Sequence, residues 1–189
     1  MVDNVSLMRK AKAQLADNWA NAAIATFIYM TILTASSFTY VAQLILTGPL
    51  SFGYVLFMAC IVDTHANNLN LLFKGFERFA DTLVAGLLYS IAVSILCALL
   101  IVPGSIAALG FSMSFFIMVD DANISGIDAL KMSWNMMKGH KWDLFCLLIR
   151  FIGWILLSII TLGIGFFWLQ PYMTVTTLNF YRSLRYGTC

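Results

Sequence analysis

The chain has 189 residues, of which 61% are hydrophobic and 11% carry a charge, and its mean hydropathy is +0.86. A soluble domain typically has about 25% charged residues, and a soluble fold of this length could not hide so much apolar surface. The composition therefore favours lipid as the solvent. The net charge of +2 comes from few, scattered basic residues, so we expect no nucleic-acid partner.

The first unit begins with a mixed polar and apolar segment over residues 6–17, and an apolar stretch of 45 residues follows over 18–62. Gly48 and Pro49 interrupt this stretch. Glycine and proline end helices where the backbone reverses, so the pair predicts a turn between two membrane helices.

One side of the first predicted membrane helix is polar. Steps of three and four residues place its polar members on one helical stripe, in which only Leu33 is apolar. Two interpretations stay open, namely close helix–helix packing through small and hydroxylated side chains, or the lining of a polar cavity or substrate path. The polar members are Thr26, Tyr29, Ser36, Tyr40, Gln43 and Thr47.

The second unit repeats this order. Residues 69–81 place apolar and charged side chains on opposite sides at helical spacing, and an uncharged stretch of 38 residues follows over 82–119. Its predicted turn is at residues 102–105, around Pro103. Small residues at steps of four predict close approach of another backbone. They are Gly86, Ser90, Ser94 and Ala98 on one predicted helix, and Gly104, Ala108 and Ser112 on the next.

The third unit begins with residues 127–141, preceded by Ser125 and Asp128 at the spacing of a capping box. The following stretch, 144–181, again has 38 residues and is interrupted only by Arg150 before its predicted turn at 162–165. The Arg150 side chain either reaches back to the lipid headgroups or points into the bundle and binds an anionic group, such as a carboxylate or a lipid phosphate.

The charges that bound the second and third stretches match at a shift of 62 residues, since Asp81 matches Asp143 and Asp120 matches Arg182. Thirty-eight residues make about 57 Å of helix, or two passes through a hydrocarbon core of about 30 Å. We predict an all-α membrane protein with six transmembrane helices in three repeated hairpins. Each hairpin follows an amphipathic helix that either lies in the interface or extends the membrane helix into water. The 189 residues form one domain, with units of about 1–66, 67–124 and 125–189 in a pseudo-threefold bundle.

All charged residues except Arg150 fall outside the apolar stretches, and we predict that all of them lie on one side of the membrane in this topology. The positive-inside rule makes that side cytoplasmic, so we predict a multi-pass plasma-membrane protein with both termini in the cytoplasm. Anionic lipid headgroups are then partners of the basic residues. Trp19 and Trp142 occupy matching positions where two hairpins begin, which indicates interface anchors.

Motifs along most of the chain resemble a known family. The strongest run is Gly139-His140-Lys141-Trp142-Asp143, and Thr161-Leu162-Gly163-Ile164-Gly165 and Gln170-Pro171-Tyr172 continue it. The chain resembles a bacterial integral membrane family known only as domain of unknown function nine hundred and seventy-five. The resemblance implies a bacterial plasma-membrane protein. It supplies no catalytic residues that map onto this sequence.

The sequence contains no catalytic motif of the Ser/His/Asp, HExxH, P-loop or dinucleotide-binding type. Asp63, His65, Asp120, Asp121 and His140 gather at predicted cytoplasmic helix ends, but at no spacing typical of a metal site. We therefore predict a non-enzymatic accessory or scaffold subunit, without cofactor or metal, that binds a membrane protein partner or lipid. The alternative is a small transporter or lipid-handling protein whose polar site combines the stripe with Arg150.

Overall fold

The computed structural model describes residues 4–16, 18–36, 40–64, 69–99, 101–121, 123–161 and 163–187. These ranges contain helices and no strand, which confirms the predicted all-α class. The elements are α1 (Asn4–Leu15), α2 (Trp19–Ser36), α3 (Tyr40–Thr64), the 3₁₀ helix η1 (Leu69–Phe76), α4 (Phe79–Leu99), α5 (Ile101–Phe111), α6 (Ser114–Asp120), α7 (Gly126–Met136), α8 (Lys141–Ile149), α9 (Ile152–Ile160) and α10 (Phe166–Tyr186).

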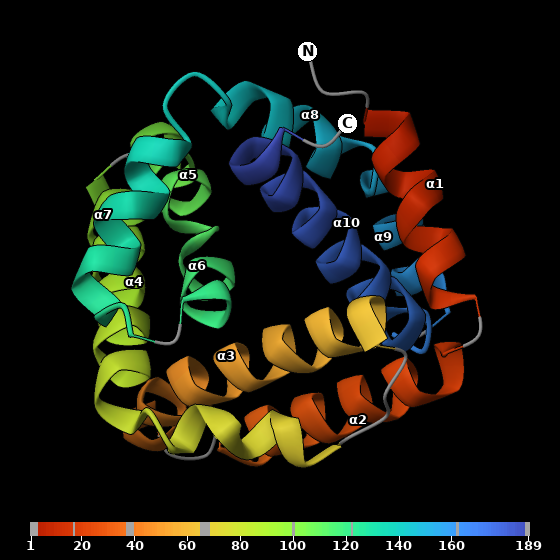
Figure 1. The fold of residues 1–189 in the computed structure, drawn as a ribbon, viewed down its shortest axis with the longest axis horizontal. Coiled ribbons are helices and arrows are strands. Elements are labelled where there is room, and N and C mark those ends of the chain that lie inside the picture. Colours follow the sequence, from red (N-terminus) through yellow and green to blue (C-terminus); the bar gives the residue numbers. More distant parts are fainter. Residues whose placement is uncertain are drawn as a thin grey trace.

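The helices lie along three sides of a triangle when the molecule is viewed down its shortest axis (Figure 1). One side holds α2, α3 and η1, the second holds α4 and α7 with α5 and α6 inside them, and the third holds α1, α9 and α10. Each side combines apolar helices of one unit with the polar–apolar helix that begins another unit. η1 begins the second unit and lies with the first, and α7 begins the third unit and lies with the second. α1 begins the first unit and lies beside α10, at the end of the third.

The contacts between units follow one cyclic order. The helix that opens each unit packs against an inner helix of the unit before it: α1 on α10, η1 on α3 and α7 on α6. The next helix follows the same rule, since α2 contacts α10, α4 contacts α3 and α8 contacts α5. The order closes on itself through α10 and α1, as expected for three related units around an axis. The pseudo-threefold arrangement of the units remains a prediction.

The predicted turn at Gly48-Pro49 is wrong, because both residues lie inside α3. Thr26 contacts Tyr54 and Tyr29 contacts Ser51, so the residue numbers of the partners decrease along α3 as those on α2 increase. The two helices are therefore antiparallel, so the reversal comes before α3 begins and not at Gly48-Pro49. Gly48 serves helix packing instead, as described next.

Glycines bring the backbones of α3, η1 and α4 into direct contact. A Cβ on Gly86 would lie 2.7 Å from Gly48 Cα, which confirms the predicted close approach at Gly86. A Cβ on Gly53 would overlap the Leu72 carbonyl, and one on Gly75 would overlap the Pro49 carbonyl. Contacts this close exclude any side chain, so the glycines let η1 lie directly on α3.

Of the other two predicted turns, the one at 102–105 is misplaced and the one at 162–165 is confirmed. Pro103 lies in the first turn of α5, where a missing N–H costs no helical hydrogen bond, so the reversal falls between α4 and α5 rather than at 102–105. The turn between α9 and α10 is confirmed at residues 163–165, where Gly163 has φ +88°. There the Gly165 N–H donates to Thr161 Oγ1 over 3.2 Å.

The predicted amphipathic segments are helical, with shifted ends. Residues 6–17 correspond to α1, 127–141 to α7, and 69–81 divide between η1 and the start of α4. The predicted cap of the third segment is confirmed. Ser125 Oγ accepts from the Asp128 N–H at 3.2 Å and lies 2.8 Å from Asp128 Oδ2.

Two segments of the described chain, Ile45–Asp63 and Lys141–Ile160, are long and apolar enough to cross a membrane, judged by length and composition. The first is 67% buried inside the molecule, whereas the second is only 22% buried. A buried apolar helix also suits a soluble core, but the exposed apolar surface of α8 and α9 needs lipid or a partner to cover it. The six spans and the orientation of the termini remain predictions.

Candidate functional site

The predicted polar stripe does not form one continuous surface. Because the chain reverses between α2 and α3, Thr26 and Tyr29 lie on one helix and Thr47 on the other. The side chains of Ser36, Tyr40 and Gln43 lie outside the described residues. The single stripe was therefore wrong, since it assumed one helix through residues 26–47.

The two stripe residues of α2 take part in the contact with α3. Thr26 is fully buried, and its Oγ1 lies 2.9 Å from the Tyr54 hydroxyl. The Tyr29 hydroxyl lies 3.3 Å from Ser51 Oγ, and the rings of Tyr29 and Tyr54 stack with centroids 4.9 Å apart. For Thr26 and Tyr29 the structure thus favours helix packing over the lining of a cavity.

Arg150 lies at the break between α8 and α9, and its side chain is exposed. It forms no ion pair with a carboxylate in the described ranges, and Asp143 instead lies 3.2 Å from His140 Nδ1. The structure does not bring Arg150 into contact with Thr26 or Tyr29. An exposed guanidinium at this position fits the interpretation in which it reaches toward headgroups.

The predicted anchors have different surroundings. Trp142 is 68% exposed and contacts Phe145, with ring centroids 5.2 Å apart, as suits an interfacial side chain. Trp19 is half-buried against Tyr172, with centroids 6.3 Å apart. Trp19 therefore also forms part of a cleft, which is described below.

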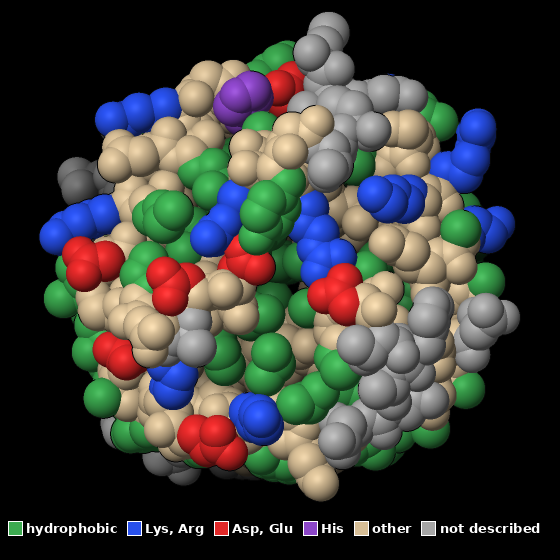
Figure 2. Space-filling model, in the orientation of Figure 1, with side chains coloured by type: hydrophobic (Ala, Val, Ile, Leu, Met, Phe, Trp, Pro, Cys, Tyr) green, Lys and Arg blue, Asp and Glu red, His purple; other side chains and the backbone are tan. Residues whose placement is uncertain are grey.

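Charged side chains join the C-terminal ends of three inner helices, α3, α6 and α10. Arg182 Nη2 lies 2.6 Å from Asp63 Oδ2, and Arg185 Nη1 lies 3.0 Å from Asp120 Oδ2. A carboxylate at a helix C-terminus is disfavoured by the helix dipole, so the two arginines of α10 offset both carboxylates. Figure 2 shows acidic and basic side chains spread over the face that carries the chain termini.

Two tyrosines complete this inner-helix cluster. The hydroxyls of Tyr181 and Tyr186 donate to Asp120 Oδ2 at 3.0 Å and 2.6 Å. The bond to the Asp120 carboxylate raises the pKa of Tyr186, because the neutral phenol is the form that donates. Both carboxylates are thus used in contacts between helices, and the described ranges contain no group of three or more metal-ligating side chains.

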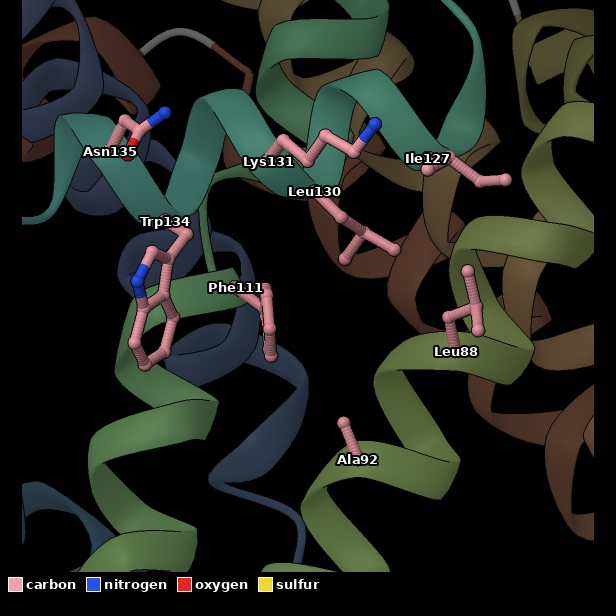
Figure 3. Close-up of a pocket in the computed structure, with 8 residues that line it drawn as sticks. All are labelled: Leu88, Ala92, Phe111, Ile127, Leu130, Lys131, Trp134 and Asn135. Carbon is pink, nitrogen blue, oxygen red and sulfur yellow. The ribbon is translucent and has the colours of Figure 1, made fainter.

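A first cleft, which we call the α7 cleft, lies between α4, α5 and α7 (Figure 3). It encloses about 460 Å³. Leu130 and Trp134 project from α7 towards Phe111, Leu88 and Ala92, while Lys131 lies along the edge (Figure 3). The Lys131 ammonium is 3.4 Å from Asp128, so its charge is already partnered.

A second cleft, the α1 cleft, lies between α1, the start of α2, α9 and α10 and encloses about 410 Å³. Three indoles, those of Trp19, Trp154 and Trp168, form its walls, and Lys12 is its charged lining residue. Among the described residues, no carboxylate lines it. Lys12 is exposed and forms no ion pair within the described part of the chain.

The two clefts occupy matching places in the second and third units. Each lies between helices of one unit and the opening helix of the following unit, α7 in one case and α1 in the other. Ala92 of the α7 cleft and Trp154 of the α1 cleft are 62 residues apart, which is the shift of the repeat. In the remaining unit, η1 takes the equivalent place and lies directly on α3 through Gly53 and Gly75.

Sequence reasoning missed both clefts. Lys12 and Trp154 are far apart in the chain, and the cyclic order of contacts alone brings α1 onto the third unit. The available signal was the alignment of the units, which places Ala92 and Trp154 at the same position.

The described residues form an all-helical protein with two segments suited to crossing a membrane. Residues 91–187 match the family described as protein of unknown function (DUF975), and the chain belongs to that family. No curated protein and no solved structure gives a significant match. The family predicted from the sequence motifs is thereby confirmed.

Proposed function

We propose that this chain is a non-enzymatic bacterial plasma-membrane protein that acts by binding, as an accessory or scaffold subunit for a membrane partner or lipid. The two apolar clefts carry the proposal, because both have mostly apolar walls and open beside a polar–apolar helix, α7 in one case and α1 in the other. A cleft of about 300–1,000 Å³ with mostly apolar walls and few polar groups is typical of a ligand site.

Two further observations support binding over transport. The stripe residues Thr26 and Tyr29 are hydrogen-bonded within the contact of α2 and α3. The apolar surface of α9 is widely exposed, with Ile160 at 77%. A membrane scaffold uses such an outer surface, whereas a transporter needs a polar path through its centre.

The test is purification from native membranes in a mild detergent, with mass spectrometry of every co-purifying protein and lipid. Ile127→Asn changes an exposed wall of the α7 cleft, and Met132→Asn changes an exposed residue of α7 outside it. We expect a stoichiometric protein or lipid that Ile127→Asn releases and Met132→Asn retains.

Transport is the competing outcome. Thr26→Val removes the hydroxyl that contacts Tyr54 but leaves both clefts unchanged. A substrate flux in vesicles that is abolished by Thr26→Val and unaffected by Ile127→Asn would contradict the scaffold proposal. So would recovery of the protein in the soluble fraction.

A further inference from the structure

We infer that the α1 cleft binds one anionic phospholipid, with an acyl chain between the indoles and the phosphate beside Lys12. This inference deepens the proposed function, on which it rests. It assigns the cleft a ligand class, and it distinguishes this cleft from its counterpart in the second unit.

The walls of the α1 cleft select a hydrocarbon chain. Trp19, Trp154 and Trp168 supply broad apolar faces, and Leu157 and Leu169 extend them. Trp154 and Leu157 are 54% and 51% exposed on α9, so the cleft is continuous with the exposed apolar surface of that helix. An acyl chain in the neighbouring leaflet can therefore enter sideways, without leaving an apolar environment.

Among the polar groups that line the α1 cleft, the Lys12 ammonium is the one without a partner of opposite charge among the described residues. Ser158 Oγ donates to the Trp154 carbonyl at 2.8 Å, and the Tyr172 hydroxyl donates to the Met8 carbonyl at 3.2 Å. These donors are used inside the protein, whereas the Lys12 ammonium has no carboxylate partner among the described residues. A cation beside an apolar cleft complements an anionic headgroup.

The α7 cleft provides the internal comparison. It has a similar volume and also carries a lysine, but Lys131 is paired with Asp128 over 3.4 Å. An added anion would compete with Asp128 there, whereas the described residues place no carboxylate in the lining beside Lys12. Preference for anionic over zwitterionic lipid therefore belongs to the α1 cleft.

The experiment is native mass spectrometry of the full chain in mild detergent, titrated with phosphatidylglycerol or phosphatidylcholine of identical acyl chains. The variants are Lys12→Glu and the matched control Lys10→Glu, an exposed lysine of α1 that does not line the cleft. Wild type should bind one phosphatidylglycerol in preference to phosphatidylcholine. Lys12→Glu should weaken that binding about tenfold, because an attraction becomes a repulsion, and Lys10→Glu should leave it unchanged.

Three results would overturn the inference: equal binding of the two lipids, equal loss in both variants, or displacement of bound lipid by excess glycerol 1-phosphate. The last result would mean that the headgroup alone is recognised, without the chain. If Lys12→Glu alters the fold, judged by circular dichroism, Lys12→Gln replaces it. Lipid retained without dependence on Lys12 contradicts this inference alone, whereas absence of any retained lipid or partner contradicts the proposed function too.

Discussion

At the scale of single residues, the start of α7 depends on one hydroxyl. Ser125 Oγ accepts from the Asp128 N–H, one of the helix donors that lack an intrahelical partner. We predict that Ser125→Ala lowers the free energy of unfolding by about 1 kcal/mol, and that Ser125→Thr restores most of it. Thermal unfolding in detergent measures both. Equal stability of the alanine variant and wild type would show that this cap contributes nothing.

Tyr186 predicts a dependence on alkaline pH. Its phenol donates to Asp120, and this bond raises its pKa above the usual value of about 10. A folded-state pKa above the unfolded one means that the contribution to stability is complete below the unfolded pKa and disappears as the pH rises through the folded pKa. Wild type should therefore exceed Tyr186→Phe in stability at neutral pH, and the difference should vanish in strong alkali. A difference independent of pH would contradict the role of this bond.

Local chemistry accounts for the features that the sequence predicted correctly. Ser125 and Asp128 define a cap within four residues, and Gly163 marks a turn because its φ of +88° favours glycine. Gly48 and Pro49 misled the prediction because the same residues mark turns and close helix contacts. Contacts with other elements, those of Gly48 with Thr82 and Gly86 and of Pro49 with Gly75, show that these residues serve helix packing.

At the scale of elements, the contact of η1 with α3 depends on Gly53. A Cβ there would overlap the Leu72 carbonyl, so Gly53→Ala must separate the two backbones. We predict a loss of about 1–3 kcal/mol, the usual cost of overpacking. Unfolding by denaturant in detergent would measure it.

Gly153 is the matched control for this change. It lies in α9, and nothing stands within 4 Å of the position where its Cβ would be. Gly153→Ala should therefore gain about 0.5–1 kcal/mol from helix propensity alone. If Gly53→Ala also stabilised the protein, the close approach of η1 to α3 would not depend on the missing side chain of Gly53.

The breaks within the long apolar stretches could not be predicted from the sequence, because contacts with other helices decide where they fall. α5 and α6 separate near Met113, where the Ser133 hydroxyl of α7 accepts from the Met113 N–H and donates to the Gly110 carbonyl. The hydroxyl that binds the broken backbone thus comes from the following unit. The sequence of the apolar stretch alone therefore does not indicate the break near Met113.

At the scale of the whole molecule, the composition and the repeat predicted three related units, but the order in which they meet depends on tertiary contacts. The candidate clefts arise only where a helix of one unit lies on the unit before it. The inner-helix cluster likewise joins Asp63, Asp120 and α10, one site from each unit. The sequence matched Asp120 with Arg182, but in the structure Asp120 pairs with Arg185, and Arg182 pairs with Asp63.

The Asp63–Arg182 pair predicts how far these units depend on one another. Its side chains are 49% and 28% exposed, so solvent screens the pair and a double-mutant cycle should give a coupling of only about 0.5–1 kcal/mol. Arg182→Asp alone should destabilise the fold, since two carboxylates would then face each other. Combining it with Asp63→Arg should restore most of the loss, which thermal unfolding can measure.

Asp128 and Lys131 supply the control, because this exposed pair lies within α7 and joins no units. Exchanging these two charges also disturbs the Ser125 cap, so Lys131→Gln is the cleaner change and should cost no more than about 0.5 kcal/mol. If the Asp63 and Arg182 exchange fails to restore stability while each variant still folds, α3 and α10 are not held by this pair. Their apolar contacts then close the ring, and the charges on α10 are available for a partner at the membrane surface.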